Sequence, residues 1–106
     1  MTELEKAIHS LRNTEHYYHS DAGHAWLKVP KALLVTLGIA DKITGYSYEY
    51  LDQAYLEEDQ DAVLYMKTLF PMGFDSGMYK IFRQMYIREI NDGDESNIRN
   101  FKRYVP

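Results

Sequence analysis

The sequence predicts an α+β fold, a small three-stranded antiparallel sheet packed with about four helices in a single domain. Three observations lead to this prediction. Apolar residues recur at helical spacing near the N-terminus and in the second half of the chain, and they alternate with polar residues over short central runs. The length of 106 residues suits one hydrophobic core and not two. We expect residues 1–106 to form that domain, with 93–106 as a loosely docked tail.

The first element is predicted to be a helix at the N-terminus. Thr2 and Glu5 form a T-x-x-E capping box, and apolar residues follow at helical spacing. We expect this helix to end before His16. The next residues, HYYHSDAG, are polar and aromatic and predict a connection without regular structure.

The three strands are predicted in the central part of the chain. In HAWLKV, residues 24–29, apolar and polar residues alternate as in a half-buried strand. Pro30 and Gly38 then delimit a short helix over about 31–37. ITGYSYEY and AYLEE, residues 43–50 and 54–58, predict the two strands of an antiparallel hairpin.

Two further helices are predicted after the hairpin. From Asp61 the apolar spacing is helical until Pro71. Asp75 or Ser76 can cap the following segment, which predicts the longest helix, over 77–91. The final residues predict one more helical turn, or docking through Phe101 and Tyr104.

One side of the predicted sheet is aromatic, because it carries His24, Trp26, Tyr46, Tyr48 and Tyr50. If the 77–91 helix covers this side, the aromatic residues are core, which is the favoured interpretation. If the side is open, it is a binding surface, since Tyr and Trp bury a large area at little entropic cost.

Four carboxylates crowd into AYLEEDQDA, residues 54–62. The positions do not fit a calcium-binding EF-hand loop, because Leu64 stands where Gly is required. Asp59 and Asp61 are expected to complement the dipole of the following helix or to cap its free amides. Glu57 and Glu58 remain as a solvated edge or as a negative contact for a basic partner. The candidate partner-binding residues are therefore Glu57, Glu58, Asp59, Asp61, Trp26, Tyr46 and Tyr48.

No catalytic residue and no cofactor are expected. His16, His19 and His24 could hold zinc or nickel, but they lack the regular HxxxH or HExxH spacing of a helical metal site. The sequence contains no Gly-rich phosphate loop, no G-x-S-x-G and no Cys for a nucleophile. We therefore predict a protein that is not an enzyme and binds no metal.

Charge and hydropathy limit the possible partners and locations. The formal net charge of −4 argues against direct, sequence-independent binding of nucleic acid. The sign is uneven, since 41–61 holds seven acidic residues and one basic residue, whereas 99–106 holds three basic residues and no acidic one. The longest apolar stretch, 32–40, is too short to cross a bilayer. A cytoplasmic location without membrane contact is expected.

Four segments carry a family resemblance: GHAWLKVP at 23–30, LGI at 37–39, YSY at 46–48 and YLEEDQDA at 55–62. They resemble a family of small bacterial and phage domains in which G-H-x-W-L-x-V-P precedes Y-L-E-E-D-x-D-A. The resemblance covers residues 23–62 and implies a phage, plasmid or other mobile-element setting. More distantly, the chain is similar in kind to anti-CRISPR proteins, which block host nuclease complexes by steric binding.

The leading hypothesis is a non-enzymatic inhibitor that binds a host nucleic-acid-targeting defence complex, such as a CRISPR effector subunit, by steric and electrostatic occlusion. The alternative is a small regulatory module that recognises a peptide or single-stranded nucleic acid through its aromatic sheet face, with Arg99, Lys102 and Arg103 on phosphate. A metal-dependent hydrolase that uses His16, His19 and His24 is the third hypothesis.

Overall fold

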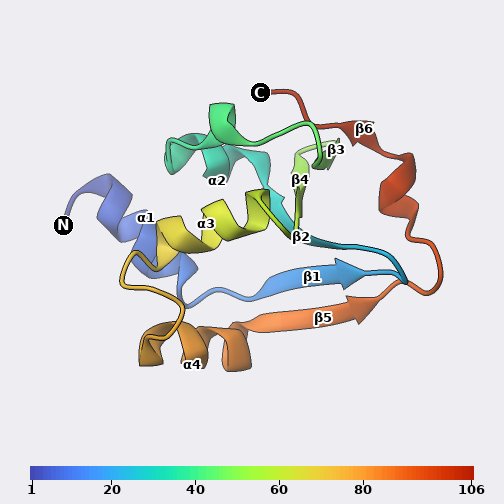
Figure 1. The fold of residues 1–106 in the computed structure, drawn as a ribbon. Helices are drawn as coiled ribbons and strands as arrows, with labels where there is room; N and C mark the ends of the chain where they lie inside the picture. Colours follow the sequence, from blue (N-terminus) through green and yellow to red (C-terminus); the bar gives the residue numbers. More distant parts are fainter.

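The computed structural model describes residues 1–106 and contains a six-stranded mixed sheet (Figure 1). The strand order is β5-β1-β2-β4-β3-β6. All neighbouring strands are antiparallel except β1 and β5, which are parallel. The strands are β1 (His16–Ser20), β2 (Ala25–Pro30), β3 (Tyr48–Tyr50), β4 (Gln53–Glu57), β5 (Ile87–Asn91) and β6 (Lys102–Arg103).

Four α-helices and two short 3-10 helices complete the fold. They are α1 (Glu3–Leu11), α2 (Lys31–Thr36), η1 (Ala40–Lys42), α3 (Asp61–Leu69), α4 (Gly77–Tyr86) and η2 (Asn97–Asn100). The capping box of Thr2 and Glu5 is present, and the Ser76 side chain caps α4. Gly38 has a φ of +74° after α2, in the left-handed region that its position predicts. None of these helices has the length and apolar character that a membrane-spanning helix requires.

The prediction of a three-stranded antiparallel sheet is wrong. The predicted strands correspond to β2, β3 and β4, which are antiparallel neighbours in the order β2-β4-β3, although β3 occupies only Tyr48–Tyr50 of the predicted 43–50. The structure adds β1 and β5 on one side of them and β6 on the other. The α+β class, the single domain and the four helices are confirmed.

The missed strands have weak local signals. HYYHS in β1 has no aliphatic residue, so it lacks the alternation of aliphatic and polar residues that usually predicts a strand. IREIN in β5 follows α4 directly and fits helical as well as strand spacing, which made 77–91 look like one helix. Residues 87–91 form a strand because they pair with β1, which lies far away in the sequence. Figure 1 shows α4 leading straight into β5, and β5 lying beside β1.

One face of the sheet packs on the helices. Leu27, Val29 and Leu56 from β2 and β4 are almost fully buried there. They belong to one core cluster with residues of all four α-helices, including Leu11, Leu34, Tyr65, Leu69 and Phe82. Burial of this apolar area is the main favourable contribution to the stability of the domain.

The other face of the sheet is covered by the C-terminal tail, residues 93–106. Trp26, Tyr48 and Tyr55 form a second cluster with Ile98 of η2, and Phe101 packs against it. The favoured interpretation of the aromatic side as core is therefore confirmed for Trp26 and Tyr48. The expected cover was wrong, because the helix α4 packs on the opposite face through Phe82.

An ion pair between a buried carboxylate and a half-buried guanidinium fastens the tail to the sheet. The Asp21 side chain is 0% exposed and accepts hydrogen bonds from Arg99 Nε at 2.5 Å and Nη2 at 2.8 Å. It also accepts from the backbone amide of Ser96 at 2.9 Å. These hydrogen bonds hold the pKa of the Asp21 carboxyl well below its ordinary value. The tail also supplies β6, and its Tyr104 hydroxyl donates to the Ala40 carbonyl at 2.8 Å.

Candidate functional site

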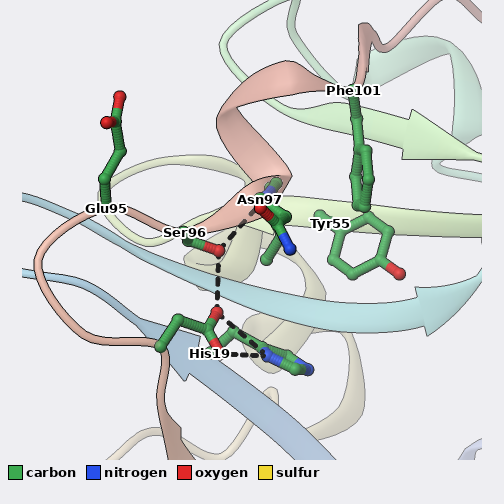
Figure 2. Close-up of a pocket in the computed structure, with 8 residues that line it drawn as sticks. His19, Tyr55, Glu95, Ser96, Asn97 and Phe101 are labelled. Carbon is green, nitrogen blue, oxygen red and sulfur yellow. Dashed lines mark hydrogen bonds and ion pairs between the residues drawn. The ribbon is translucent and has the colours of Figure 1, made fainter.

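A hollow of about 380 Å³ lies between the sheet and the tail. We call it the tail pocket. Its walls come from β1, β4, the loop after β5 and η2, and Figure 2 shows their side chains around the hollow, with Glu95 directed away from the others. The lining residues are His19, Tyr55, Asp92, Glu95, Ser96, Asn97, Ile98 and Phe101.

The register of the sheet places His19 in this pocket. In a strand, alternate side chains point to opposite faces, so His19 lies on the face opposite to His16 and Tyr18. His19 is paired with Ile90 in β5 and with Trp26 in β2. The loop after β5 therefore begins beside it, and the amide of Asp92 donates to the Ser20 carbonyl at 2.7 Å.

The floor of the tail pocket is a polar chain of three side chains. His19 Nδ1 lies 3.2 Å from Asp92 Oδ2, and Ser96 Oγ donates to the same oxygen at 2.7 Å. The carboxylate thus stands between the hydroxyl and the imidazole. In a Ser-His-Asp triad the imidazole stands in the middle and takes the hydroxyl proton. The Ser96 hydroxyl is instead directed at a carboxylate, and its oxygen caps η2 by accepting from the Ile98 amide at 3.2 Å.

The wall of the tail pocket is aromatic. Phe101 stacks on Tyr50 with 4.8 Å between ring centroids and 15° between planes, and it lies tilted against Tyr55 at 5.1 Å. The His19 ring meets Tyr55 edge-on at 6.2 Å. Phe101 is therefore held on two sides, which gives the pocket a fixed apolar surface beside its polar floor.

The rim of the tail pocket carries two polar side chains without a partner in the protein. Glu95 and Asn97 are exposed, and neither side chain takes part in a hydrogen bond or an ion pair. Figure 2 shows the Glu95 carboxylate pointing away from the floor. Floor, wall and rim together can hold a group that is positively charged, donates hydrogen bonds and has an apolar or planar face.

The predicted acidic residues separate into structural and outward-facing groups. Asp61 is 1% exposed and accepts from the Thr44 amide at 3.1 Å, the Thr44 hydroxyl at 2.7 Å and the Ser47 hydroxyl at 2.5 Å. Glu57 accepts from the backbone amides of Asp59 at 3.0 Å and Gln60 at 2.7 Å. Both carboxylates therefore shape the chain around the start of α3.

The prediction that Asp59 or Asp61 caps α3 is wrong. The N-cap of α3 is Gln60, whose side chain makes no capping hydrogen bond, and the carboxylate that accepts from the Gln60 amide is that of Glu57. Asp61 does lie in the first turn, where a negative charge complements the helix dipole. Its hydrogen bonds go to the segment before β3 instead, because that segment brings two hydroxyl groups and an amide to it.

Glu58, which is half-buried, and Asp59, which is exposed, lie at the same end of the sheet as acidic residues of a distant segment. Strands β1, β4 and β5 run in the same direction, so the loops after β4 and β5 lie at the same end of the sheet. We call this the acidic end. It comprises Glu58, Asp59, Asp92, Asp94 and Glu95. Burial and, after it, the neighbouring Asp59 raise the pKa of Glu58.

The predicted aromatic site residues do not form one open surface. Trp26 is 3% exposed and Tyr48 is 9% exposed, beneath the tail. Arg99 lies over the Trp26 ring at 5.4 Å and Arg103 over the Tyr48 ring at 4.5 Å. Tyr46 is 65% exposed in the turn before β3.

The three central histidines do not converge on one point. His16 is buried on the helical face, whereas His19 lies on the opposite face in the tail pocket. His24 is exposed in the turn before β2. The geometry thus separates the residues of the metal-dependent hydrolase hypothesis.

His16 predicts a pH dependence of stability. Its Nδ1 lies 2.7 Å from the Thr14 carbonyl and its Nε2 lies 2.7 Å from the Tyr65 hydroxyl, so a neutral ring protonated on Nδ1 satisfies both bonds. Burial lowers the pKa of His16 in the folded state. The unfolded chain therefore binds this proton more readily, and the stability from neutral His16 is complete above pH of about 6.5 and lost as the pH falls.

We expect the urea midpoint of the wild type to fall more steeply between pH 7.5 and 5 than that of His16→Gln. His9→Gln is the matched control, because His9 is exposed on α1. It should keep the slope of the wild type. Identical slopes for all three proteins would contradict the assignment.

The comparisons with known proteins add no relative. No protein-family model matches the chain. No curated protein sequence matches it. No solved structure matches it. The resemblance of 23–62 to mobile-element domains therefore stays a prediction.

The sequence did not point to the floor of the tail pocket. His19 and Asp92 are 73 positions apart and meet only because β1 and β5 pair in parallel. If HYYHS and IREIN had both been predicted as strands, a parallel pairing of the two would have placed His19 and Asp92 at one end of the sheet. Glu95 lay outside the acidic run and carries no motif.

Proposed function

We propose that this protein is a non-enzymatic inhibitor that binds a basic protein surface, in a host nucleic-acid-targeting defence complex of the kind that anti-CRISPR proteins block. The observation that carries the proposal is the acidic end. Two loops that are distant in the sequence bring Glu58, Asp59, Asp92, Asp94 and Glu95 to one end of the sheet.

The electrostatics of this end suit a partner that binds nucleic acid. Such proteins hold phosphate with clustered Lys and Arg, and an acidic surface of complementary field approaches them rapidly. A net charge of −4 is modest for a mimic of a whole phosphate backbone. We therefore favour occlusion by a specific contact, with the acidic end setting the orientation.

The polar chain in the tail pocket supports a binding role over a catalytic one. Ser96 donates directly to the Asp92 carboxylate, and no imidazole stands between the two groups as it does in a Ser-His-Asp triad. Its position under η2, with 2% exposure, fits a structural cap.

The alternative hypothesis, a regulatory module with an aromatic binding face, has few accessible binding residues in the structure. Trp26 and Tyr48 are buried, and Arg99 and Arg103 stack on them. Arg99 is also committed to Asp21. These side chains are therefore occupied within the protein and do not favour recognition of single-stranded nucleic acid.

The test is capture from a bacterial lysate followed by mass spectrometry, with a multi-subunit nuclease complex as the expected result. Asp59→Lys combined with Asp94→Lys should weaken capture by about tenfold or more, because both carboxylates are exposed and lie in the two loops of the acidic end.

The matched control is Glu15→Lys combined with Asp52→Lys. It makes the same change in net charge with exposed residues at the opposite end of the sheet. Capture by this control should equal that of the wild type. Equal loss in both double variants, or capture of nucleic acid alone, would overturn the proposal.

A further inference from the structure

We propose that the tail pocket receives one arginine side chain of a protein partner. This inference rests on the proposed function for the nature of the partner, and it assigns a contact outside Asp59 and Asp94. It is carried by three features of the tail pocket: its charge, its aromatic wall and its free acceptors.

The charge of the pocket favours a cation. Two carboxylates, Asp92 and Glu95, line it together with the imidazole of His19. The nearby Arg99 guanidinium is held by Asp21; it attracts Glu95 through space but forms no ion pair with Glu95 or Asp92. A phosphate group would meet both carboxylates, so a nucleotide is disfavoured. A metal ion is disfavoured as well, because no group of three or more His, Asp or Glu residues is placed to hold one.

The aromatic wall selects among cations. A guanidinium is planar, is weakly hydrated and stacks on aromatic rings, whereas the ammonium of lysine is compact and strongly hydrated. Phe101 and Tyr55 line the pocket, and the stack of Phe101 on Tyr50 fixes the wall before a ligand arrives. Little ordering is then required of the protein on binding.

The free acceptors match the donors of a guanidinium. Five N–H groups in one plane need several oxygen acceptors around them. The Glu95 carboxylate and the Asn97 amide oxygen have no partner in the protein. Glu95 points away from the floor in Figure 2, so its contact with a bound guanidinium requires a change of its exposed side-chain rotamer. On the floor, Asp92 Oδ1 meets only the His19 ring, at 3.3 Å. A volume of about 380 Å³ holds one such side chain with water.

The probe is N-acetyl-arginine methylamide, titrated into the ¹⁵N-labelled protein and followed by NMR. The citrulline analogue is the matched control ligand, since it has nearly the same shape and no charge. We expect saturable shifts at His19 and over residues 95–101, with a dissociation constant on the order of millimolar, and at least about fivefold weaker binding of the citrulline analogue.

Two variants test the residues of the pocket. Glu95→Gln should weaken arginine binding several-fold, and because Glu95 is exposed and unpaired the variant should fold normally. Phe101→Leu should weaken it as well by removing the wall. Glu15→Gln, at the opposite end of the sheet, should change nothing.

Equal binding of arginine and citrulline analogues, shifts outside the pocket, or unchanged affinity in Glu95→Gln would overturn the arginine site. The proposed function fails separately. If the arginine analogue binds as expected but no nuclease complex is captured, the site stands and the inhibitor proposal falls. If the complex is captured while the analogue does not bind, the inhibitor proposal stands and the arginine site falls.

Discussion

Asp61→Ala is expected to lower the free energy of unfolding by about 3 kcal/mol or more. The carboxylate is buried and accepts hydrogen bonds from Thr44 and Ser47. Its removal leaves an amide and two hydroxyl groups without their acceptor, in a place that water hardly reaches. Urea denaturation followed by circular dichroism measures the loss.

The matched control for this substitution is Asp59→Ala. Asp59 is two positions away and exposed, and its side chain accepts no hydrogen bond. The control should change the free energy of unfolding by less than about 0.5 kcal/mol. Equal effects of the two substitutions would show that the acids of 57–61 act as one group, against the division into structural and outward-facing residues.

Trp26→Ala is expected to cost about 3–5 kcal/mol, as for other large aromatic residues in a core. Trp26 is 3% exposed, contacts the tail cluster and carries the Arg99 guanidinium over its ring. The substitution should also release the tail, so hydrogen exchange at Ile98 and Tyr104 should become faster while the amides of α3 change less.

Tyr46→Ala is the control for Trp26, since both were candidate binding residues and Tyr46 is 65% exposed. It should change stability by no more than about 0.5 kcal/mol. A tail that stays protected in the folded state of Trp26→Ala would contradict the role of the indole as an apolar contact that holds the tail.

The elements that could be predicted are those whose signals are local. The capping box at Thr2, the short helix between Pro30 and Gly38 and the hairpin of β3 and β4 depend on residues within a few positions of one another. The helix that starts at Asp61 is of the same kind. Propensity and spacing suffice there.

The features that could not be predicted depend on contacts between distant segments. Residues 87–91 are a strand because β1 offers them an edge, and the tail covers Trp26 because Asp21 binds Arg99. The tail pocket follows from both contacts. In the acidic run 57–61, residue type alone did not predict which side chain is buried. Asp61 is buried because the segment before β3 supplies hydrogen-bond donors to it, whereas Asp59 has no such partner and is exposed.

The parallel pairing of β1 and β5 has a consequence for synthesis on the ribosome. The ribosome makes the chain from its N-terminus, so β5 is made more than sixty residues after β1. During that time β1 can pair with β2 only. Contacts of such long sequence separation form late and slow the folding rate. Until then the edge of β1 is open to strands of other nascent chains, a known route to aggregation.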